Sequence, residues 1–295
     1  MFPIIPANSV AADSGNSEGI FGYGRYTTAT NLVSNAGVVS TDVTGVGTYR
    51  IELSACEYGG DKGIFGYGIG ASHFSMTNLV SNTGVVSTDV TGVGTARRGS
   101  AACSYGTDKG IFAFGDTGSG YTGVTNLVSN TGVVASDVAA VATAKGYASA
   151  CEYGDDKGIF GYCYIAAISA ATNLVSNTGV VSSDVTGVGT AKYAGAACSY
   201  GGDKGIFGYG YNGSSNDSTT NLVSNAGVVS SDVTGVGTAR YYLAACEYGG
   251  DKGIFGYGSS ASSVTNLVSN TGVVASDQAA TTGTGRDSLA ACSFN

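Results

Sequence analysis

Apolar residues in this chain come in short runs of two or three, separated by glycine and small polar residues. The stretch 220–258 shows the pattern, with apolar pairs in TNLVSN, GVVSSD, YLAACEY and GIFGYG and the turns SNAG and YGGDK between them. Val, Ile, Phe and Tyr fill these segments and no long 3.6-residue period appears, so each segment predicts a short β-strand. The glycines of both turns stand where a tight hairpin needs a positive φ.

The same four segments recur six times along the chain. The spacing from each TNLVSN to the next GIFGYG element is constant, whereas the spacing from GIFGYG to TNLVSN varies, so the length variation between successive repeats falls in one loop. The last repeat adds one residue elsewhere. The GIF element begins at Gly19, Gly63, Gly110, Gly158, Gly205 and Gly253, and TNLVSN begins at Thr30, Thr77, Thr125, Thr172, Thr220 and Thr265.

The predicted strands carry apolar or small residues on both faces, which is typical of sheets buried on both sides. Repeated four-stranded sheets that pack face to face around an axis form a β-propeller. The sequence therefore predicts an all-β fold, a six-bladed β-propeller with four antiparallel strands per blade and the small AAC strand innermost. A β-solenoid is the alternative, although its repeats usually have shorter periods.

The two ends of the chain predict how the ring closes. The sequence ends with an innermost strand around 290–292, which we expect to complete the first blade begun by residues 19–42. A weak copy at 10–12 competes for that place, but the C-terminal copy also carries the basic residue of the repeat, Arg286. We expect an N-terminal arm at 1–17, which could lie on a neighbouring subunit, and the propeller at 18–295.

The stretch TARYYLAACEYGGDKGIFGYG resembles the start of a kelch repeat. It has a basic residue, a small-residue strand, a tight turn and an apolar-aromatic strand that ends in glycine, and the match covers all six repeats. The near-identical repeats also resemble repetitive propeller proteins encoded by marine bacteriophages. The kelch resemblance implies that the loops between second and third strands, and the connections from fourth to first strands, form the ligand face.

Variation between the repeats is concentrated in those two sets of connections, which antiparallel strands place on one face. They are rich in Tyr, Ser, Gly and Asn, the residue types of recognition loops, in which Tyr supplies rigid contacts and small polar residues adapt around them. Neutral drift of exposed loops is the alternative, but the turns on the other face are also exposed and hardly vary. The predicted ligand-binding face comprises Tyr26, Tyr49, His73, Phe74, Arg98, Tyr121, Tyr147, Tyr164, Tyr193, Tyr211, Asn212, Tyr241 and Tyr242.

Composition narrows the function classes. The formal net charge of −8 argues against a nucleic-acid partner, and no apolar stretch has the length of a membrane span. The N-terminus lacks the basic and apolar regions of a signal peptide. Six of the seven cysteines hold one repeat position and are expected to be buried free thiols, because equivalent positions in a ring are too far apart for disulfides. These six are Cys56, Cys103, Cys151, Cys198, Cys246 and Cys292.

Candidate catalytic chemistry is sparse in this sequence. Copper oxidases with kelch-like propellers need at least two His ligands, and His73 is the single histidine. The repeated Asp and Arg or Lys residues indicate structural ion pairs or turn caps, because a catalytic carboxylate set would break the symmetry of the repeat. We therefore expect no catalytic residue, no metal and no cofactor.

These observations favour a non-enzymatic recognition module, adhesin-like and on a virion or cell surface, that binds a glycan or protein with its variable loop face. The alternative is a structural virion or scaffold component that uses the ring as a rigid docking platform. An engineered consensus propeller is a third interpretation, since the repeats are so alike.

Overall fold

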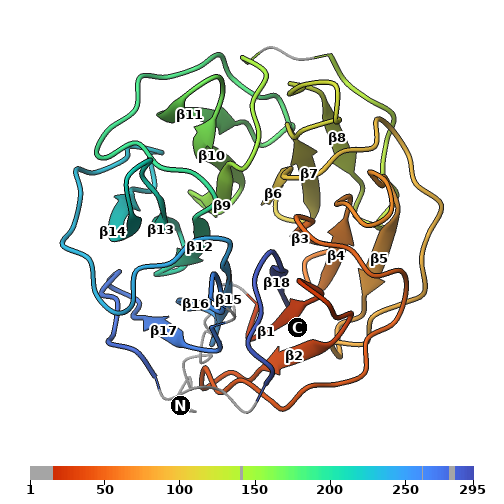
Figure 1. The fold of residues 1–295 in the computed structure, drawn as a ribbon, viewed down its shortest axis with the longest axis horizontal. Helices are drawn as coiled ribbons and strands as arrows, with labels where there is room; N and C mark the ends of the chain where they lie inside the picture. The colour runs from red at the N-terminus through yellow and green to blue at the C-terminus, as the bar shows by residue number, and fades with distance from the viewer. Residues whose placement is uncertain (1–15, 140–141, 261, 279–282) are drawn as a thin grey trace, which may run out of the picture.

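The computed structural model describes residues 16–139, 142–260, 262–278 and 283–295. Within these residues it contains eighteen β-strands and no helix. The strands form six three-stranded sheets, here called blades 1 to 6, arranged around a central axis as in a propeller (Figure 1). The all-β, propeller-like prediction is confirmed at this level.

Each blade has an inner, a middle and an outer strand, paired antiparallel. The inner strands of blades 1 to 6 are β18 (Ala290–Phe294), β3 (Ser54–Tyr58), β6 (Ala101–Tyr105), β9 (Ser149–Tyr153), β12 (Ala196–Tyr200) and β15 (Ala244–Tyr248). The middle strands are β1 (Glu18–Gly22), β4 (Lys62–Gly66), β7 (Lys109–Ala113), β10 (Lys157–Tyr164), β13 (Lys204–Tyr211) and β16 (Lys252–Gly256). The outer strands are β2 (Thr30–Val33), β5 (Thr77–Val80), β8 (Thr125–Val128), β11 (Ile168–Val175), β14 (Asn216–Val223) and β17 (Thr265–Val268).

The prediction of four strands per blade is wrong, because the fourth segment does not form a continuous ladder. In blade 1 it runs beside β2 through two isolated bridges, Thr30 with Val43 and Val33 with Val39. Between these bridges the side-chain amide of Asn31 donates to the backbone carbonyl of Ser40 at 3.0 Å, and the Ser40 hydroxyl accepts from the backbone N–H of Leu32 at 2.8 Å. The backbone N–H of Ser40 still donates to the Leu32 carbonyl at 2.8 Å, so side chains replace only part of the backbone pairing that a fourth strand needs. No sheet closes on itself among the described residues.

The C-terminal strand completes blade 1, as predicted. β18 pairs antiparallel with β1 along its whole length, with Glu18 opposite Phe294 and Gly22 opposite Ala290. In Figure 1 the last strand therefore lies beside the first, at the centre of the ring. Of the predicted N-terminal arm, residues 1–15, which include the competing copy at 10–12, lie outside the described residues.

Two circles of backbone hydrogen bonds join the blades, one at each end of the inner strands. At one end, the residue four before each inner-strand cysteine donates its N–H to the carbonyl of the equivalent residue in the preceding blade, at 2.7–3.0 Å. At the other end, the residue after each inner strand donates to the following blade, at 2.7–3.1 Å. The first circle, here called the upper ring, consists of Glu52, Gly99, Tyr147, Ala194, Tyr242 and Ser288.

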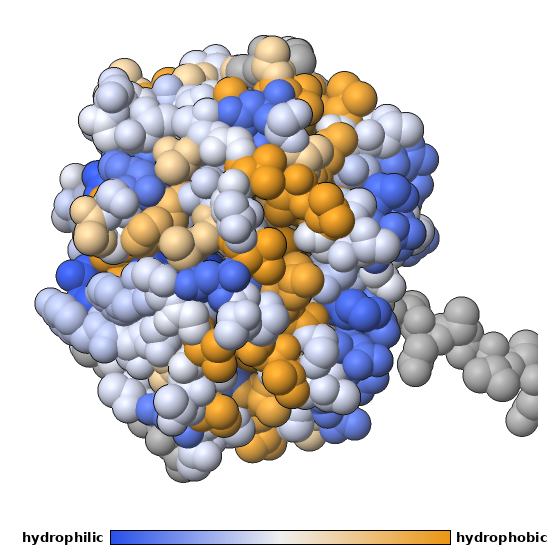
Figure 2. Space-filling view, turned by 90° about the vertical axis from the view of Figure 1, so that its right-hand side faces the viewer, coloured by the Kyte–Doolittle hydropathy of each residue, from blue (hydrophilic) through white to orange (hydrophobic). Residues whose placement is uncertain are grey.

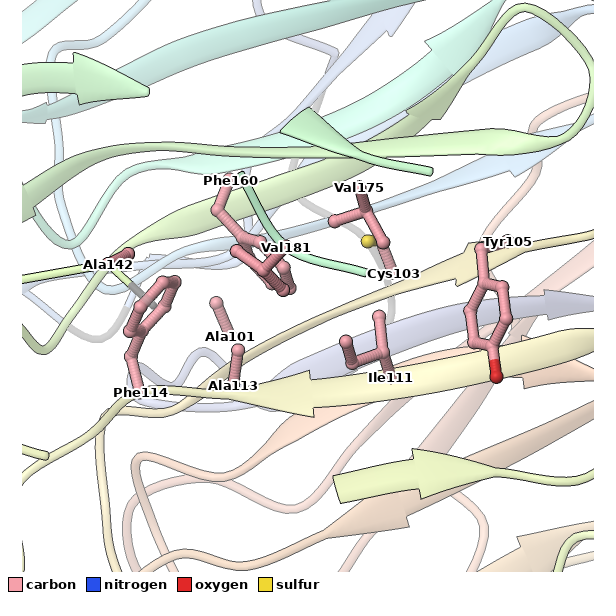
Figure 3. Packing of buried hydrophobic residues seen from close by; sticks show 10 residues of the cluster. All are labelled: Ala101, Cys103, Tyr105, Ile111, Ala113, Phe114, Ala142, Phe160, Val175 and Val181. Carbon is pink, nitrogen blue, oxygen red and sulfur yellow. The ribbon is translucent and has the colours of Figure 1, made fainter. Parts of the chain in front are cut away.

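Aromatic pairs fill the spaces between neighbouring blades. The Phe of each GIF element meets the Tyr or Phe that ends the middle segment of the blade before it, with ring centroids 5.0–5.3 Å apart. Figure 3 shows the pair Phe114 and Phe160 at one end of a buried cluster and Tyr105 at the other, with Cys103 and Val175 between them. Edge-to-face pairs of this kind add stability beyond the apolar area they bury.

The inner cysteines occupy the closest approach between blades. All seven cysteines are free and buried, which confirms the expectation for the six at the repeat position. The Sγ of each inner cysteine packs against the first glycine of the GIF element in the next blade, so that a Cβ on that glycine would overlap the sulfur. This contact explains why AAC and GIF recur together in the sequence.

An apolar rim surrounds the molecule at the outer segments. The first Val of each GVV pair is 62–66% exposed. In Figure 2, which looks at the side of the ring near β5 and β8, apolar residues form a band across that side. No helix of the described residues is long and apolar enough to cross a membrane.

The contact between Gly63 and Cys292 gives a test of the blade packing. In Gly63→Ala the new methyl group would overlap the Cys292 Sγ, whereas the other neighbours lie at 3.4 Å or more. We expect this variant to lose about 1–3 kcal/mol of unfolding free energy, the usual cost of overpacking a core. Adding Cys292→Ala removes the sulfur and should recover at least about 1 kcal/mol, measured as the coupling energy of a double-mutant cycle by urea unfolding. Additive losses would contradict the described packing.

Candidate active site

The two sets of variable connections lie against each other at one end of the molecule. Isolated bridges join Tyr193 to Tyr211 in blade 5 and Gly146 to Tyr164 in blade 4. Arg98 is joined to Asp116 in blade 3 in the same way. The loop that follows each middle strand is thus paired with the connection that leads into the inner strand of the same blade. We call this end of the molecule the loop face.

Seven of the predicted site tyrosines form one continuous aromatic cluster on the loop face. Tyr147 is its centre, with ring centroids 6.5 Å from Tyr121, 6.0 Å from Tyr193 and 6.0 Å from Tyr242. The remaining contacts, at 4.8–6.0 Å, connect Tyr164, Tyr211 and Tyr241 to these rings. All seven are half-buried, so their rings are held by their neighbours while part of each stays accessible.

The other predicted residues lie outside this cluster, apart from Arg98. Tyr26 is 86% exposed and its backbone N–H bonds the hydroxyl of Tyr49. His73 lies close to Gly118, and Phe74 lies against Gly70. Asn212 caps its own loop, because its side-chain oxygen accepts from the backbone N–H groups of residues 214 and 215 at 2.9 Å.

The upper ring encircles the axis beneath the tyrosine cluster. All six of its residues have φ between 52° and 58°, and only one of them is glycine. This left-handed conformation costs a non-glycine residue about 1–2 kcal/mol. Since it occurs in every blade, the conformation belongs to the repeat, and what distinguishes the blades is the side chain presented there. Only Glu52 presents a charged group.

Glu52 is held by groups from two other blades. The hydroxyl of Tyr147 donates to Glu52 Oε2 at 3.2 Å, and Arg98 Nε lies 3.6 Å from the same oxygen. The Tyr147 ring reaches across because it passes over Gly99, where a Cβ would come within 2.8 Å of the ring. Gly99 in the intervening blade is thus required by the contact between Glu52 and Tyr147.

Arg98 links Glu52 to a second carboxyl group. Its guanidinium pairs with Asp116 Oδ2 at 3.0 Å, and the other oxygen of Asp116 accepts the backbone N–H of Gly118 at 2.8 Å. Burial raises the pKa of Glu52, and Arg98 offsets part of this increase. Burial and the nearby Glu52 also raise the pKa of Tyr147. The site thus combines a carboxyl group whose pKa is raised by burial with a second carboxyl group that pairs closely with the Arg98 cation.

The axis beneath this site is narrow. The upper ring lines a cavity of about 90 Å³, and a second cavity of about 50 Å³ lies among the inner cysteines. A water molecule takes about 30 Å³ of liquid volume, so these spaces hold a few waters at most. A ligand larger than that has to lie on the tyrosine cluster itself, with Glu52 below it.

The repeated charged residues are structural, as predicted. Arg50 is fully buried, with Nε on the Tyr67 carbonyl at 2.8 Å and its guanidinium 4.5 Å from the Tyr23 ring centroid. Asp89 accepts the backbone N–H and the hydroxyl of Thr48 from the preceding blade. The basic residues are thus enclosed between blades and do not form an open anion-binding ring.

Known proteins resemble this chain in fold and not in sequence. No protein-family model matches the chain, and no curated protein matches it. A solved structure described as a novel fungal alcohol oxidase of the AA5 family, in complex with copper, matches 92% of this chain and 67% of its own, with a TM-score of 0.58 and 13% identity. At this identity the likeness establishes the fold alone.

This finding corrects two predictions from the sequence. The predictions of a non-enzymatic recognition module, with its alternative of a structural scaffold, and of no enzymatic activity are both contradicted by this match, because the matched protein is an oxidase. The exclusion of catalysis had two physical grounds, the lack of metal ligands and the symmetry of the repeated carboxylates. Neither covers Glu52, which is not a repeated carboxylate and needs no metal.

The copper of that oxidase does not fit the residues of this chain. The described residues contain no group of three or more His, Cys, Asp or Glu side chains that could hold a metal ion. The single histidine, His73, lies at the periphery of the loop face against Gly118. The described residues therefore offer no site for a catalytic copper ion.

The sequence-based prediction named the tyrosines and Arg98 but did not include the carboxyl groups of Glu52 and Asp116 that lie beside them. Glu52 could have been found by aligning the six repeats, because it occupies a position that Gly, Tyr, Ala and Ser hold elsewhere. Asp116 lies in a loop of unique sequence, and nothing in the repeat marks it.

The raised pKa of Glu52 predicts a pH dependence of stability. A carboxyl group whose folded-state pKa is raised stabilises the fold below its unfolded pKa, and this contribution is lost as pH rises through the folded-state pKa. The unfolding free energy of the wild type minus that of Glu52→Gln should therefore fall as pH rises above 4.5, the ordinary pKa of a glutamate. Urea unfolding at several pH values measures it.

Asp203→Asn supplies a control of opposite sign. The pKa of Asp203 is lowered by its hydrogen bond from Lys204, so the same difference should rise with pH for this variant. If the difference for Glu52→Gln also rises with pH, Glu52 is stabilised in its ionised form and the described environment is wrong.

Proposed function

We propose that this chain is a hydrolase that cleaves a glycosidic bond in a carbohydrate held on the tyrosine cluster, with Glu52 as the proton donor. The observation that carries the proposal is the placement of Glu52, whose carboxyl group is bound by Tyr147 and Arg98 at the centre of the loop face and has a raised pKa. An acid whose pKa is brought closer to neutral is what general-acid catalysis requires.

The tyrosine cluster supports a carbohydrate as the substrate class. Each ring offers an apolar surface for the C–H face of a sugar and a hydroxyl group for its oxygen atoms. The face combines Tyr with small polar residues, which adapt to a ligand of many hydroxyl groups. The charges nearest the substrate, Arg98 with Glu52 and Asp116, pair with one another, which suits a neutral ligand.

Glu52 and Asp116, which both pair with Arg98, support the two roles that most glycoside hydrolases assign to a pair of carboxyl groups, a general acid and a general base. In the proposed reaction, Glu52 transfers its proton to the oxygen of the leaving sugar as the bond from that oxygen to the anomeric carbon breaks. A water molecule forms the new bond to the anomeric carbon and gives its proton to Asp116. Exchange with solvent then returns a proton to Glu52 and removes one from Asp116.

We also propose the finer assignment of the fold, a six-bladed, kelch-like propeller with a degenerate fourth strand in each blade. Two isolated bridges per blade hold the fourth segment antiparallel to the outer strand, which supports this reading. The likeness to an oxidase fold is consistent with it.

Hydrolysis of a panel of 4-nitrophenyl glycosides by the purified chain tests the function. We expect turnover of at least one glycoside, and a fall of about 10²–10⁴-fold in kcat for Glu52→Gln, the usual contribution of a general acid. Replacing both Tyr164 and Tyr211 with Ala should raise KM at least about tenfold, since aromatic contacts contribute about 1–4 kcal/mol each.

Two turn variants away from the loop face, Thr83→Ser and Asp203→Asn, serve as controls and should keep wild-type kcat and KM. Absence of turnover on every glycoside would overturn the proposal, as would full activity in Glu52→Gln. Cleavage of 4-nitrophenyl acetate but of no glycoside would show that the substrate class is wrong.

A further inference from the structure

The end of the axis opposite Glu52 carries a second set of carboxyl groups. The residue that follows each inner cysteine alternates between glutamate and serine around the ring. Every second blade therefore contributes a glutamate, which gives the set approximate threefold symmetry. The glutamates are Glu57, Glu152 and Glu247, and the serines are Ser104, Ser199 and Ser293.

Five of these six residues, all but Ser293, line a cavity of about 770 Å³, here called the glutamate cavity. Its wall also includes Tyr58, Tyr153 and Asp155. Lys109 is the one basic side chain among the described lining residues, and it pairs with Asp108 at 2.6 Å. The wall therefore carries an excess of acidic groups.

Glu247 points to a missing partner in this cavity. Its side chain is only 8% exposed, and its Oε1 atom is buried without a hydrogen-bond partner. By contrast, Glu57 Oε2 accepts a hydrogen bond from the side chain of Asn16 at 2.7 Å. A buried carboxyl oxygen without a partner is costly, and a ligand that donates a hydrogen bond there would remove the cost.

The burial and mutual repulsion of the three glutamates favour a cation as the ligand. Burial raises the pKa of Glu57, and burial together with the neighbouring carboxyl groups raises the pKa of Glu152 and of Glu247. Three carboxyl groups that repel one another cannot all ionise readily unless positive charge enters between them. A cationic ligand would therefore be attracted to this cavity, because the one basic side chain on its described wall, Lys109, is already paired with Asp108.

The size and spacing of the site favour an organic cation over a metal ion. No three acidic side chains of the described residues lie close enough together to coordinate one ion. The cavity is also far larger than the about 30 Å³ that a water molecule takes. A polyamine carries several ammonium groups along one chain, so each can donate to a different carboxyl group where the three lie too far apart to share one ion. The tyrosines on the wall offer apolar surface to a methylene chain.

We propose that the glutamate cavity binds an aliphatic polyamine, with separate ammonium groups paired to Glu57, Glu152 and Glu247 and the chain along the tyrosine-lined wall. Asp155 lies on the same wall, near Glu152, and adds negative charge to that part of the cavity. This site is at the far end of the axis from Glu52, so it is independent of the proposed hydrolase.

Calorimetric titration of the full chain with spermidine tests the proposal. We expect saturable binding of one spermidine per chain, weakened at least tenfold by Glu247→Gln and by Glu57→Gln. The control is Asp61→Asn, which removes a carboxylate that pairs with Lys62 outside the cavity wall and should leave the affinity unchanged.

A substitution can change the stability of the protein as well as its affinity for spermidine. The shift in Tm that spermidine causes in each variant separates the two effects. Spermidine should raise the Tm of the wild type and of Asp61→Asn, but not that of Glu247→Gln measured against its own ligand-free state. Equal binding by all variants, or no saturable binding by the wild type, would overturn the proposal. Tighter binding of magnesium than of spermidine at matched ionic strength would overturn the choice of an organic cation.

Discussion

Six backbone hydrogen bonds, each from one blade to the one before it, hold the upper ring together and fix the arrangement of everything around the axis. To make them, one residue per blade adopts the left-handed conformation, so that its N–H and carbonyl face the two neighbouring blades. Five non-glycine residues at about 1–2 kcal/mol each cost roughly as much as six hydrogen bonds return at about 0.5–1.5 kcal/mol each. The ring therefore determines geometry more than it adds stability.

Stability comes from the packing between blades, and this explains why the chain repeats itself so faithfully. Each inner cysteine touches a glycine of the next blade, and each GIF phenylalanine touches an aromatic ring of the blade before it. A substitution at one of these contacts therefore disturbs the packing of the neighbouring blade as well. Only residues outside these contacts are free to differ between repeats. The loop face, the residue presented at the upper ring and the residue after each cysteine are such positions, and all of the proposed chemistry lies there.

Much of the fold could be predicted from the sequence because the repeat encodes local patterns. Short apolar runs and glycine turns gave three strands per blade, and the chain order gave the pairing of β18 with β1. The prediction of a fourth strand was wrong because the outer-strand Asn of each blade, such as Asn31, donates to the backbone of the fourth segment, where a regular ladder would pair backbone with backbone. The function failed for a different reason. The contacts of Glu52 come from Tyr147 and Arg98, which lie far from it in the sequence, belong to other blades and meet it only in the assembled ring.

Hydrogen–deuterium exchange of the upper-ring amides tests most directly whether the ring fixes the assembly. If it does, the N–H groups of Gly99, Tyr147, Ala194 and Tyr242 should exchange only through global unfolding, with the same free energy as strand amides such as that of Ile64. The amide of Val43, held by an isolated bridge in an outer segment, should exchange much faster. If the ring amides exchange as fast as that of Val43 while the strand amides stay protected, the blades are held by packing alone and the account of the ring is wrong.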